Sequence, residues 1–351
     1  MAVNVAERPI PGIQNEQALD ALLSEPPQSC VEAVAALDGD IMILGAGGKM
    51  GPTVARMARR AVDEAGVNKR VIAVSRFGDG DTDVHLRADG VETIACDLLD
   101  HRALAELPDA RNILFLAGRK FGSSGAEWLT WAMNTYLPGV VMERFPESRF
   151  VVLSTGNVYP MLPVTHGGAT EETPVAPVGE YAESCLGRER VMEHFSRQRG
   201  TPVTLIRLNY AVELRYGILL DVAKQVQAGT PIDLAMGNVN GVWQGDAAAY
   251  FLQAFSLCAS PPEVLNVTGP ETISVRWLAH RFAELLDTPP PAFVGVESDT
   301  ALLNNAGRCF RHFGYPRVSL DQMVEWVADW LRRGGRLLDK PTHFEARDGR
   351  F

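Results

Sequence analysis

Short apolar runs alternate with amphipathic stretches along most of the chain. Runs typical of buried strands cover residues 41–44, 70–74, 92–95, 112–118, 150–155 and 203–208. Apolar residues at the three- and four-residue spacing of a helix lie between these runs. The first such set is Val54, Met57, Ala58, Ala61 and Val62. This alternation predicts a parallel α/β sheet with right-handed crossover connections.

The first apolar run ends at a glycine cluster, and a helical pattern begins immediately after it. Gly45, Gly48 and Gly51 give the spacing G-x-x-G-x-x-G. The G-x-G-x-x-G spacing fails at Met50, and the Walker phosphate-loop spacing fails at Ile43 and Met50. A glycine turn between strand and helix favours pyrophosphate binding, although an ordinary tight turn also uses glycines. We therefore predict a doubly wound Rossmann domain that binds a dinucleotide.

The end of the second strand carries the residues that select between NAD and NADP. An acid at this place accepts a hydrogen bond from the ribose 2′-OH of NAD, whereas an arginine accommodates the 2′-phosphate of NADP. Here Ser75 takes the place of the acid and Arg76 follows it, while Asp81 lies further on and is expected to miss the ribose. We therefore expect NADP rather than NAD, unless Arg76 is a solvated loop charge.

The third and fourth strands end in polar or small residues at the same edge of the sheet. Asp97 follows the third strand, where adenine is expected to lie. The fourth strand ends in Leu116, Ala117 and Gly118, and small residues there let the backbone approach a cofactor closely. Asn134 lies in a helix predicted around 125–145.

The chain divides into four parts on these patterns. Residues 1–38 form an extension with helical pieces at 16–24 and 29–37, residues 39–210 hold the Rossmann domain, residues 211–335 hold mainly a smaller α/β substrate lobe, and residues 336–351 form a tail. We expect the extension to pack on the domain as a strap. A helix at 320–333 is expected to pack Met323, Val324, Val327, Trp330 and Leu331 into the core.

Composition excludes several classes of partner. The formal net charge of −10 gives no basic field for nucleic acid or an anionic membrane, and no apolar run approaches the about 20 residues of a membrane span. The five cysteines are scattered and form no C-x-x-C pair, which favours reduced thiols in the cytoplasm. The histidines show no metal-binding spacing, so we expect no metal.

The order of these motifs resembles the extended short-chain dehydrogenase/reductases, the NAD(P)-dependent epimerase/dehydratase family. The resemblance runs from about residue 40 to 335 and adds the segment 154–159, Tyr181, and the segments 207–210, 241–247 and 265–269. It implies NADP or NAD as cofactor and a sugar or sugar derivative, nucleotide-linked ones included, as substrate. It also implies a homodimer formed by the helices that contain Asn134 and Tyr181, with Trp128, Trp131 and Tyr136 at the surface.

The resemblance assigns roles to particular residues. Cofactor contacts are expected from Gly45, Gly48, Lys49, Met50, Gly51, Ser75, Arg76, Asp97, Leu98, Leu116, Ala117, Gly118, Lys120 and Asn134. Substrate contacts are expected from Lys120, Asn157, Asn209 and Arg215. Arg215 is also compatible with a solvated surface charge. Asp246, at the start of a helix predicted at 247–255, is expected to be an N-cap.

The expected catalytic residues depart from the family at one position. Thr155 is the hydroxyl residue and Tyr181 the acid/base, but Cys185 takes the place of the lysine that lowers the pKa of the tyrosine. A free tyrosine has a pKa near 10, so a cation is needed nearby. Arg188, Lys120 and an oxidised nicotinamide are candidates for that charge. The sequence leaves two hypotheses: an enzyme that transfers hydride, or a nucleotide-binding sensor or scaffold without turnover.

Overall fold

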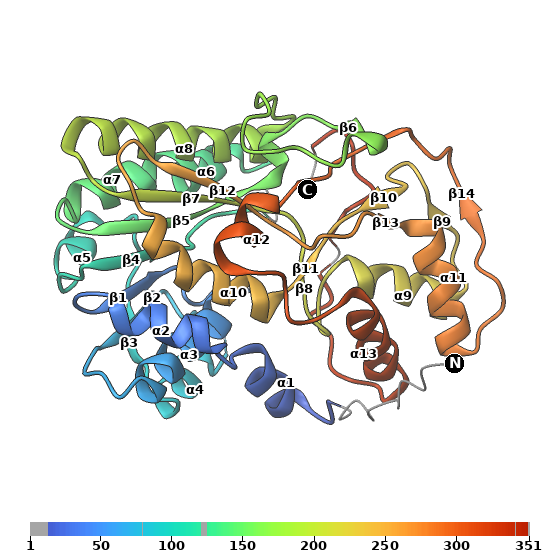
Figure 1. Cartoon of the computed structure of the whole chain (residues 1–351), viewed down its shortest axis with the longest axis horizontal. Coiled ribbons are helices and arrows are strands. Elements are labelled where there is room, and N and C mark those ends of the chain that lie inside the picture. The colour runs from blue at the N-terminus through green and yellow to red at the C-terminus, as the bar shows by residue number, and fades with distance from the viewer. Residues whose placement is uncertain (1–12, 79, 121–124, 341, 350–351) are drawn as a thin grey trace.

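Seven parallel strands form one sheet, in the order β12-β7-β5-β4-β1-β2-β3 (Figure 1). The computed structural model describes residues 13–78, 80–120, 125–340 and 342–349. The strands are β1 Ile41–Leu44, β2 Val71–Ser75, β3 Glu92–Ala95, β4 Asn112–Phe115, β5 Arg149–Thr155, β7 Val203–Leu208 and β12 Glu263–Val267. The predicted doubly wound Rossmann sheet is confirmed.

Helices cover both faces of this sheet, and the central strand β1 is apolar and buried throughout. Successive residues of β1 point to opposite faces: Ile41 and Ile43 pack with α2, α3 and α10, whereas Met42 and Leu44 pack with α5, α7 and α8. The bounds are α2 Gln28–Ala36, α3 Gly51–Glu64, α4 Thr82–Ala88, α5 His101–Ala105, α6 Glu127–Trp131, α7 Leu137–Arg144, α8 Glu180–Arg199 and α10 Gln244–Gln253.

The described part of the N-terminal extension, residues 13–38, packs on the domain, as expected of a strap. Its helices are α1 Glu16–Leu23 and α2, close to the predicted 16–24 and 29–37. Cys30, Val31 and Val34 of α2 are buried in the same core as α3 and α10. Leu19 and Leu23 of α1 are fully buried in the core of the second lobe.

The second lobe is built around the helices α9 Ile218–Ala228, α11 Val275–Leu286 and α13 Leu320–Arg332. Short strands pair at its edges: β6 Leu162–Pro163 with β15 Thr300–Ala301, β8 Ala211–Val212 with β11 Val242–Trp243, β9 Ile232–Asp233 with β14 Phe293–Val294, and β10 Asn238–Val239 with β13 Ile273–Ser274. The predicted stripe of α13 is buried, and Ser319 and Gln322 form a capping box at its start. The remaining helix, α12 Gly307–Phe313, lies near β12.

Two local predictions were wrong or incomplete. Asp246 is no N-cap, because α10 already begins at Gln244; its carboxylate accepts hydrogen bonds from Arg317 Nε (3.1 Å) and Val318 N (3.0 Å). It therefore holds the chain that leads into α13. The helix predicted around 125–145 contains a π-helical turn over Ala132–Tyr136, a feature often found at functional sites.

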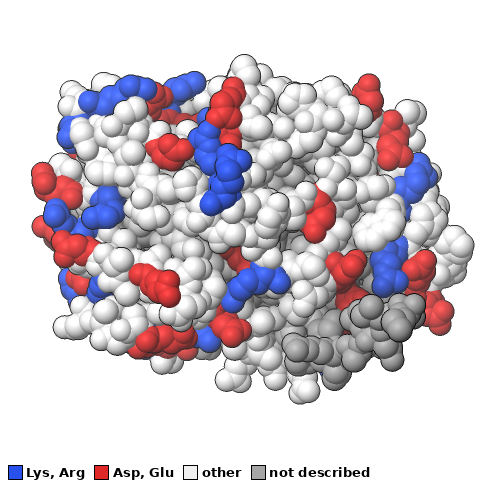
Figure 2. All heavy atoms as spheres, viewed as in Figure 1, with Lys and Arg blue, Asp and Glu red and all other residues white. Residues whose placement is uncertain are grey.

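Charges of both signs are spread over the face of the molecule drawn in Figure 2, where Lys and Arg are interspersed with Asp and Glu. Within the described ranges, no helix is both long and apolar enough to cross a membrane.

Candidate active site

A cleft with a volume of about 1460 Å³ runs along the carboxyl ends of β1, β4, β5 and β7. This edge of a doubly wound sheet is where ligands bind. Gly45, Leu116, Thr155 and Leu208 line it from the sheet, and Arg215 and its neighbours line it from the second lobe. Small-molecule pockets typically measure about 300–1,000 Å³, so this cleft has room for a dinucleotide together with a second ligand.

The glycines of the turn between β1 and α3 serve two purposes. A Cβ on Gly45, which has φ +90°, would lie 2.6 Å from Ala117 N, and one on Gly51 would lie 2.2 Å from Ala46 O. These two positions exclude a side chain because the chain packs on itself. A Cβ on Gly48 would meet only Gly45 O, at 3.3 Å, and Gly48 lines the cleft. The turn is therefore open to a ligand beside the N-terminus of α3.

Lys49 joins this turn to the second lobe. Its ammonium donates to Ala211 O (3.0 Å) and lies 3.6 Å from the centroid of the Tyr216 ring. Burial lowers the pKa of Lys49 to about 7; nearby Glu213 opposes that shift, while Lys120 adds to it. Spacing alone placed Lys49 with the cofactor and gave no sign of this contact.

Gly118 has no room for a side chain because an arginine packs against it. A Cβ there would lie 2.5 Å from Arg188 Nη2. The guanidinium of Arg188 donates to Asn134 Oδ1 (2.9 Å), to Asn134 O (3.3 Å) and to Leu153 O. Asn134 also accepts from Arg119 N (2.8 Å). Asn134 therefore braces the loop after β4 against α8, and the charge of Arg188 lies beneath the floor of the cleft.

Tyr181, Thr155 and Cys185 come together where α8 meets the end of β5. The Tyr181 hydroxyl lies beside the Thr155 side chain and the thiol of Cys185. Tyr181 and Thr155 line the cleft, whereas Cys185 is fully buried behind them. Burial raises the pKa of Tyr181 far above its ordinary value, Cys185 adds to the rise, and Arg188 opposes it. The phenol therefore stays protonated unless a further cation acts on it.

Lys120, half-buried in the loop after β4, is the lysine near that phenol. Its ammonium lies 5.9 Å from the centroid of the Tyr181 ring, and it interacts electrostatically with Cys185. Burial lowers the pKa of Lys120 to about 8. A lysine from another element therefore lies near Tyr181, although α8 carries Cys185 in the lysine position.

The expected substrate residues all line the cleft. Asn157 N donates to Thr155 Oγ1 (3.2 Å), and Asn209 Nδ2 donates to Asn240 Oδ1 (2.7 Å). Arg215 is not a solvated charge, because it forms ion pairs with Glu213, Asp20 and Glu16.

Several expected cofactor residues lie beside or behind the cleft rather than on its lining. These are Ser75, Arg76, Asp97, Leu98, Ala117 and Asn134. Arg76 is exposed, Asp97 accepts from Leu99 N (3.1 Å), and Leu98 is buried in the core beneath α5. Met50 and Gly51, by contrast, line the cleft at the start of α3.

A buried ion pair that sequence reasoning missed supports the site from behind. Arg207 on β7 binds Glu189 on α8 through both carboxylate oxygens, at 2.7 and 3.0 Å. Glu189 also accepts from Ser154 Oγ (2.6 Å), and Arg207 donates to the Tyr159 hydroxyl (2.7 Å). The network fixes the end of β5 against α8, and so places Thr155 relative to Tyr181. A charged residue inside the apolar run 203–208 was the available signal.

The sequence model of the NAD dependent epimerase/dehydratase family matches residues 41–214. Residues 41–214 belong to this family. Its members are enzymes, and the matched segment contains the glycine turn, Thr155, Tyr181 and Cys185. No curated protein matches the sequence of this chain.

Solved structures of epimerases and dehydratases share the fold at low sequence identity. UDP-glucose 4-epimerase of Thermotoga maritima, with UDP-glucose, is 17% identical, with a TM-score of 0.68 over 84% of this chain and 99% of that one. UDP-glucuronic acid 4-epimerase of Bacillus cereus, with NAD, is 16% identical, with a TM-score of 0.69 over 84% and 99%. dTDP-glucose 4,6-dehydratase of Streptomyces venezuelae, with NAD, is 18% identical, with a TM-score of 0.71 over 84% and 97%. The Bacillus cereus and Streptomyces venezuelae structures hold NAD, and nothing in the comparisons supports a preference for NADP.

Proposed function

We propose that this chain is a dinucleotide-dependent oxidoreductase of the epimerase or dehydratase type that acts on a sugar, nucleotide-linked sugars included. The observation that carries the proposal is the juxtaposition of Tyr181 and Thr155 in a cleft that includes an open glycine turn. Gly48, Lys49 and Met50 at the start of α3 would hold the pyrophosphate. A bound nicotinamide would supply the hydride acceptor and donor.

The chain's own residues supply the acid–base chemistry. Tyr181 takes the proton from a substrate hydroxyl and returns it to the carbonyl oxygen, while Thr155 hydrogen-bonds the same oxygen. Formation of the phenolate needs a nearby positive charge, since burial raises the pKa of Tyr181. Lys120 supplies that charge in place of the lysine that Cys185 replaces. Arg188 also opposes the rise in the pKa of Tyr181, but its guanidinium is held behind the cleft by Asn134 and the Leu153 carbonyl.

We propose NAD as the cofactor, in place of the NADP suggested by Arg76. Arg76 is exposed and stands outside the cleft lining, so it offers no contact to a 2′-phosphate there. Asp81 lines the cleft instead, and its negative charge disfavours a 2′-phosphate. The NAD held by the family's solved structures supports the same choice.

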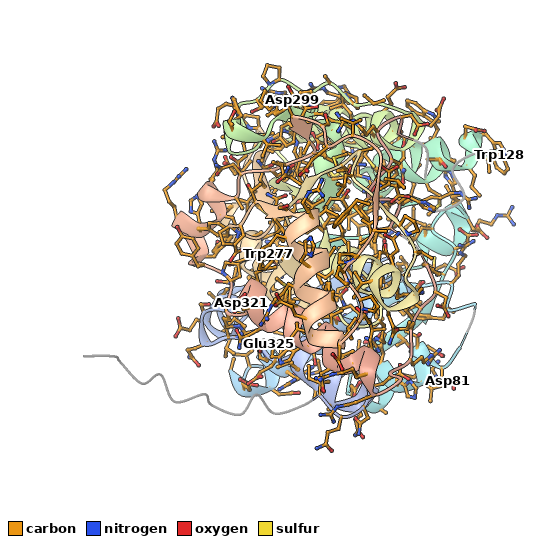
Figure 3. All side chains as sticks on the ribbon, turned by 90° about the vertical axis from the view of Figure 1, so that its right-hand side faces the viewer. Asp81, Trp128, Trp277, Asp299, Asp321 and Glu325 are labelled. Atoms are coloured by element: carbon orange, nitrogen blue, oxygen red, sulfur yellow. The ribbon has the colours of Figure 1, made fainter. Side chains whose placement is uncertain are left out.

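The helices α6, α7 and α8 also present an apolar groove that we assign to a second copy of the chain. The groove has a volume of about 620 Å³ and is lined by residues that include Trp128, Tyr136, Val140 and Phe195. Trp128 is 74% exposed, and Figure 3 shows it projecting from the edge of the molecule. Exposed aromatic side chains that are grouped in one patch are typical of protein interfaces.

Light scattering after size exclusion tests the dimer. We expect native protein at twice the chain mass, and Trp128→Glu at the mass of one chain, because a charge in an apolar interface is left unpaired. Trp277→Glu is the matched control, since Trp277 is exposed on α11, which lies away from the groove (Figure 3). A monomeric native protein, or a dimeric Trp128→Glu, contradicts the assignment.

One competing function is supported by a specific observation. Cys185 in the lysine position and the raised pKa of Tyr181 favour a nucleotide-binding sensor or scaffold that has lost turnover. Incubation of the protein with NAD and a panel of UDP- and dTDP-linked hexoses, followed by product analysis, separates the two. A converted sugar supports the enzyme; NAD binding without conversion of any sugar supports the sensor.

A further inference from the structure

Helix α1 lies at the end of the cleft where α3 begins, and its acidic residues contact arginines from both lobes. Asp20 binds Arg56 of α3 (3.2 Å) and Arg215 of the second lobe (2.9 Å). Glu16 binds Arg215 (3.4 Å) and Arg336 (3.5 Å). All five of these side chains line the cleft. A single carboxylate, that of Asp20, therefore connects the two lobes across the cleft.

The α1 carboxylates decide the sign of the charge in this cluster, because with them the three arginines face four acids. Arg215 is 14% exposed and Arg56 is 16% exposed, so neither charge is neutralised by water alone. Apart from α1, Arg215 contacts Glu213 and Arg56 contacts Asp89. Without Glu16 and Asp20, three arginines would face two acids, which leaves one excess positive charge in the cleft beside the glycine turn. An arginine cluster with excess charge is a site for phosphate.

We propose that Arg56, Arg215 and Arg336 form a phosphate-binding site in the cleft, and that Glu16 and Asp20 of α1 act as its internal competitor. The inference rests on the proposed function, because the ligand is a phosphate-bearing substrate or cofactor. When the phosphate binds, Arg215 and Arg56 exchange the α1 carboxylates for phosphate oxygens. Leu19 and Leu23 hold α1 in the second lobe's core. The side chains of Glu16 and Asp20 can therefore release the arginines while the helix stays folded.

The contacts of the tail fit this assignment. Leu338 N donates to Arg215 O (3.0 Å), and Arg336 and Leu338 both line the cleft. The tail therefore carries one arginine of the site and fixes the backbone of another. Two segments outside the matched family region, α1 and the tail, therefore contact the same arginine cluster.

Calorimetric titration with inorganic pyrophosphate tests the site without depending on turnover. We expect Glu16→Gln combined with Asp20→Asn to bind pyrophosphate at least about tenfold more tightly than native protein, because two competing charges are removed. Asp20→Asn alone should give a smaller gain and serves as a second variant. Glu32→Gln combined with Asp63→Asn is the matched control: it removes the same charge from exposed positions of α2 and α3 that do not line the cleft.

Arg215→Met, added to the double variant, tests whether the arginines cause the tighter pyrophosphate binding. This third substitution should abolish the increase in affinity. Titration with NAD and with UDP-glucose then shows which ligand carries the phosphate. Equal pyrophosphate affinity in native protein and the double variant, or a gain that survives Arg215→Met, overturns the inference. If native protein converts a sugar but pyrophosphate affinity does not change, the inference fails and the proposed function stands. If the gain appears but no NAD binds, the site stands and the proposed function fails.

Discussion

Replacement of Tyr181 by phenylalanine is expected to lower kcat on a nucleotide sugar by about 10²- to 10⁴-fold, the usual contribution of a positioned general acid–base. The change removes only the hydroxyl that meets Thr155 and Cys185, and leaves the ring in place. Affinity for NAD should therefore stay within about twofold, since the pyrophosphate is held at the glycine turn. Steady-state kinetics together with NAD titration separate the two effects.

Tyr210→Phe is a suitable control, because Tyr210 is another buried phenol that lines the same cleft. It should retain most of the native kcat. If Tyr181→Phe keeps native turnover, Tyr181 is not the acid/base and the proposed mechanism is wrong.

Replacement of Lys120 by methionine is expected to lower kcat about 10- to 100-fold near neutral pH. The increase of kcat with pH, which follows deprotonation of Tyr181, should move to higher pH. A pKa shift of one unit corresponds to about 1.4 kcal/mol of differential interaction, and loss of the ammonium leaves Arg188 to oppose the effect of burial on Tyr181. In native protein the pKa of Lys120 is lowered to about 8, so its charge is present below that pH and is lost above it. Native activity should therefore fall on the alkaline side of about pH 8.

The matched variants sharpen this prediction. Lys120→Arg keeps its charge above pH 8, so its alkaline fall should disappear. Cys185→Lys should restore activity to Lys120→Met, because it places an ammonium one helical turn from Tyr181. Lys224→Met is the control, since Lys224 is paired with Asp339 on the surface. A native pH profile in Lys120→Met would show that another group supplies the charge.

Much of the fold could be predicted because its signals are local. Each apolar run became a strand of the sheet within a residue or two at most boundaries, since four to six consecutive apolar residues can be buried on both faces only in a central strand. The spacing of Gly45, Gly48 and Gly51 likewise indicates a turn, in which Gly48 and Gly51 pack on neighbours close in sequence. Helix α13 could be predicted from its apolar stripe.

The parts of the site that could not be predicted depend on residues far apart in the chain. Gly118 was assigned to close approach of a cofactor, but its missing side chain makes room for Arg188, seventy positions later. Arg215 could not be paired with Asp20, because nothing in either segment indicates the other. Asp246 looked like a cap because its partners, Arg317 and Val318, belong to a distant loop. Long-range polar pairing leaves no periodic pattern in the sequence.

The replacement of lysine by Cys185 takes on a specific meaning in this geometry. Cys185 is buried beside Tyr181, and a thiol is either neutral or negative, so it cannot supply a positive charge. In the proposed mechanism the charge comes from Lys120, on the loop after β4, whose ammonium lies 5.9 Å from the centroid of the Tyr181 ring. The proposal therefore divides the catalytic residues between α8 and this loop.

The absorbance of the nicotinamide, followed after native protein saturated with NAD is mixed with nucleotide sugars, tests the central claim most directly. The account predicts that NAD binds and that at least one sugar produces reduced nicotinamide or a converted product, and that Tyr181→Phe abolishes this change. If NAD binds but neither reduced nicotinamide nor product forms with any sugar, hydride transfer at Tyr181 is contradicted and the cleft is a nucleotide-binding site alone.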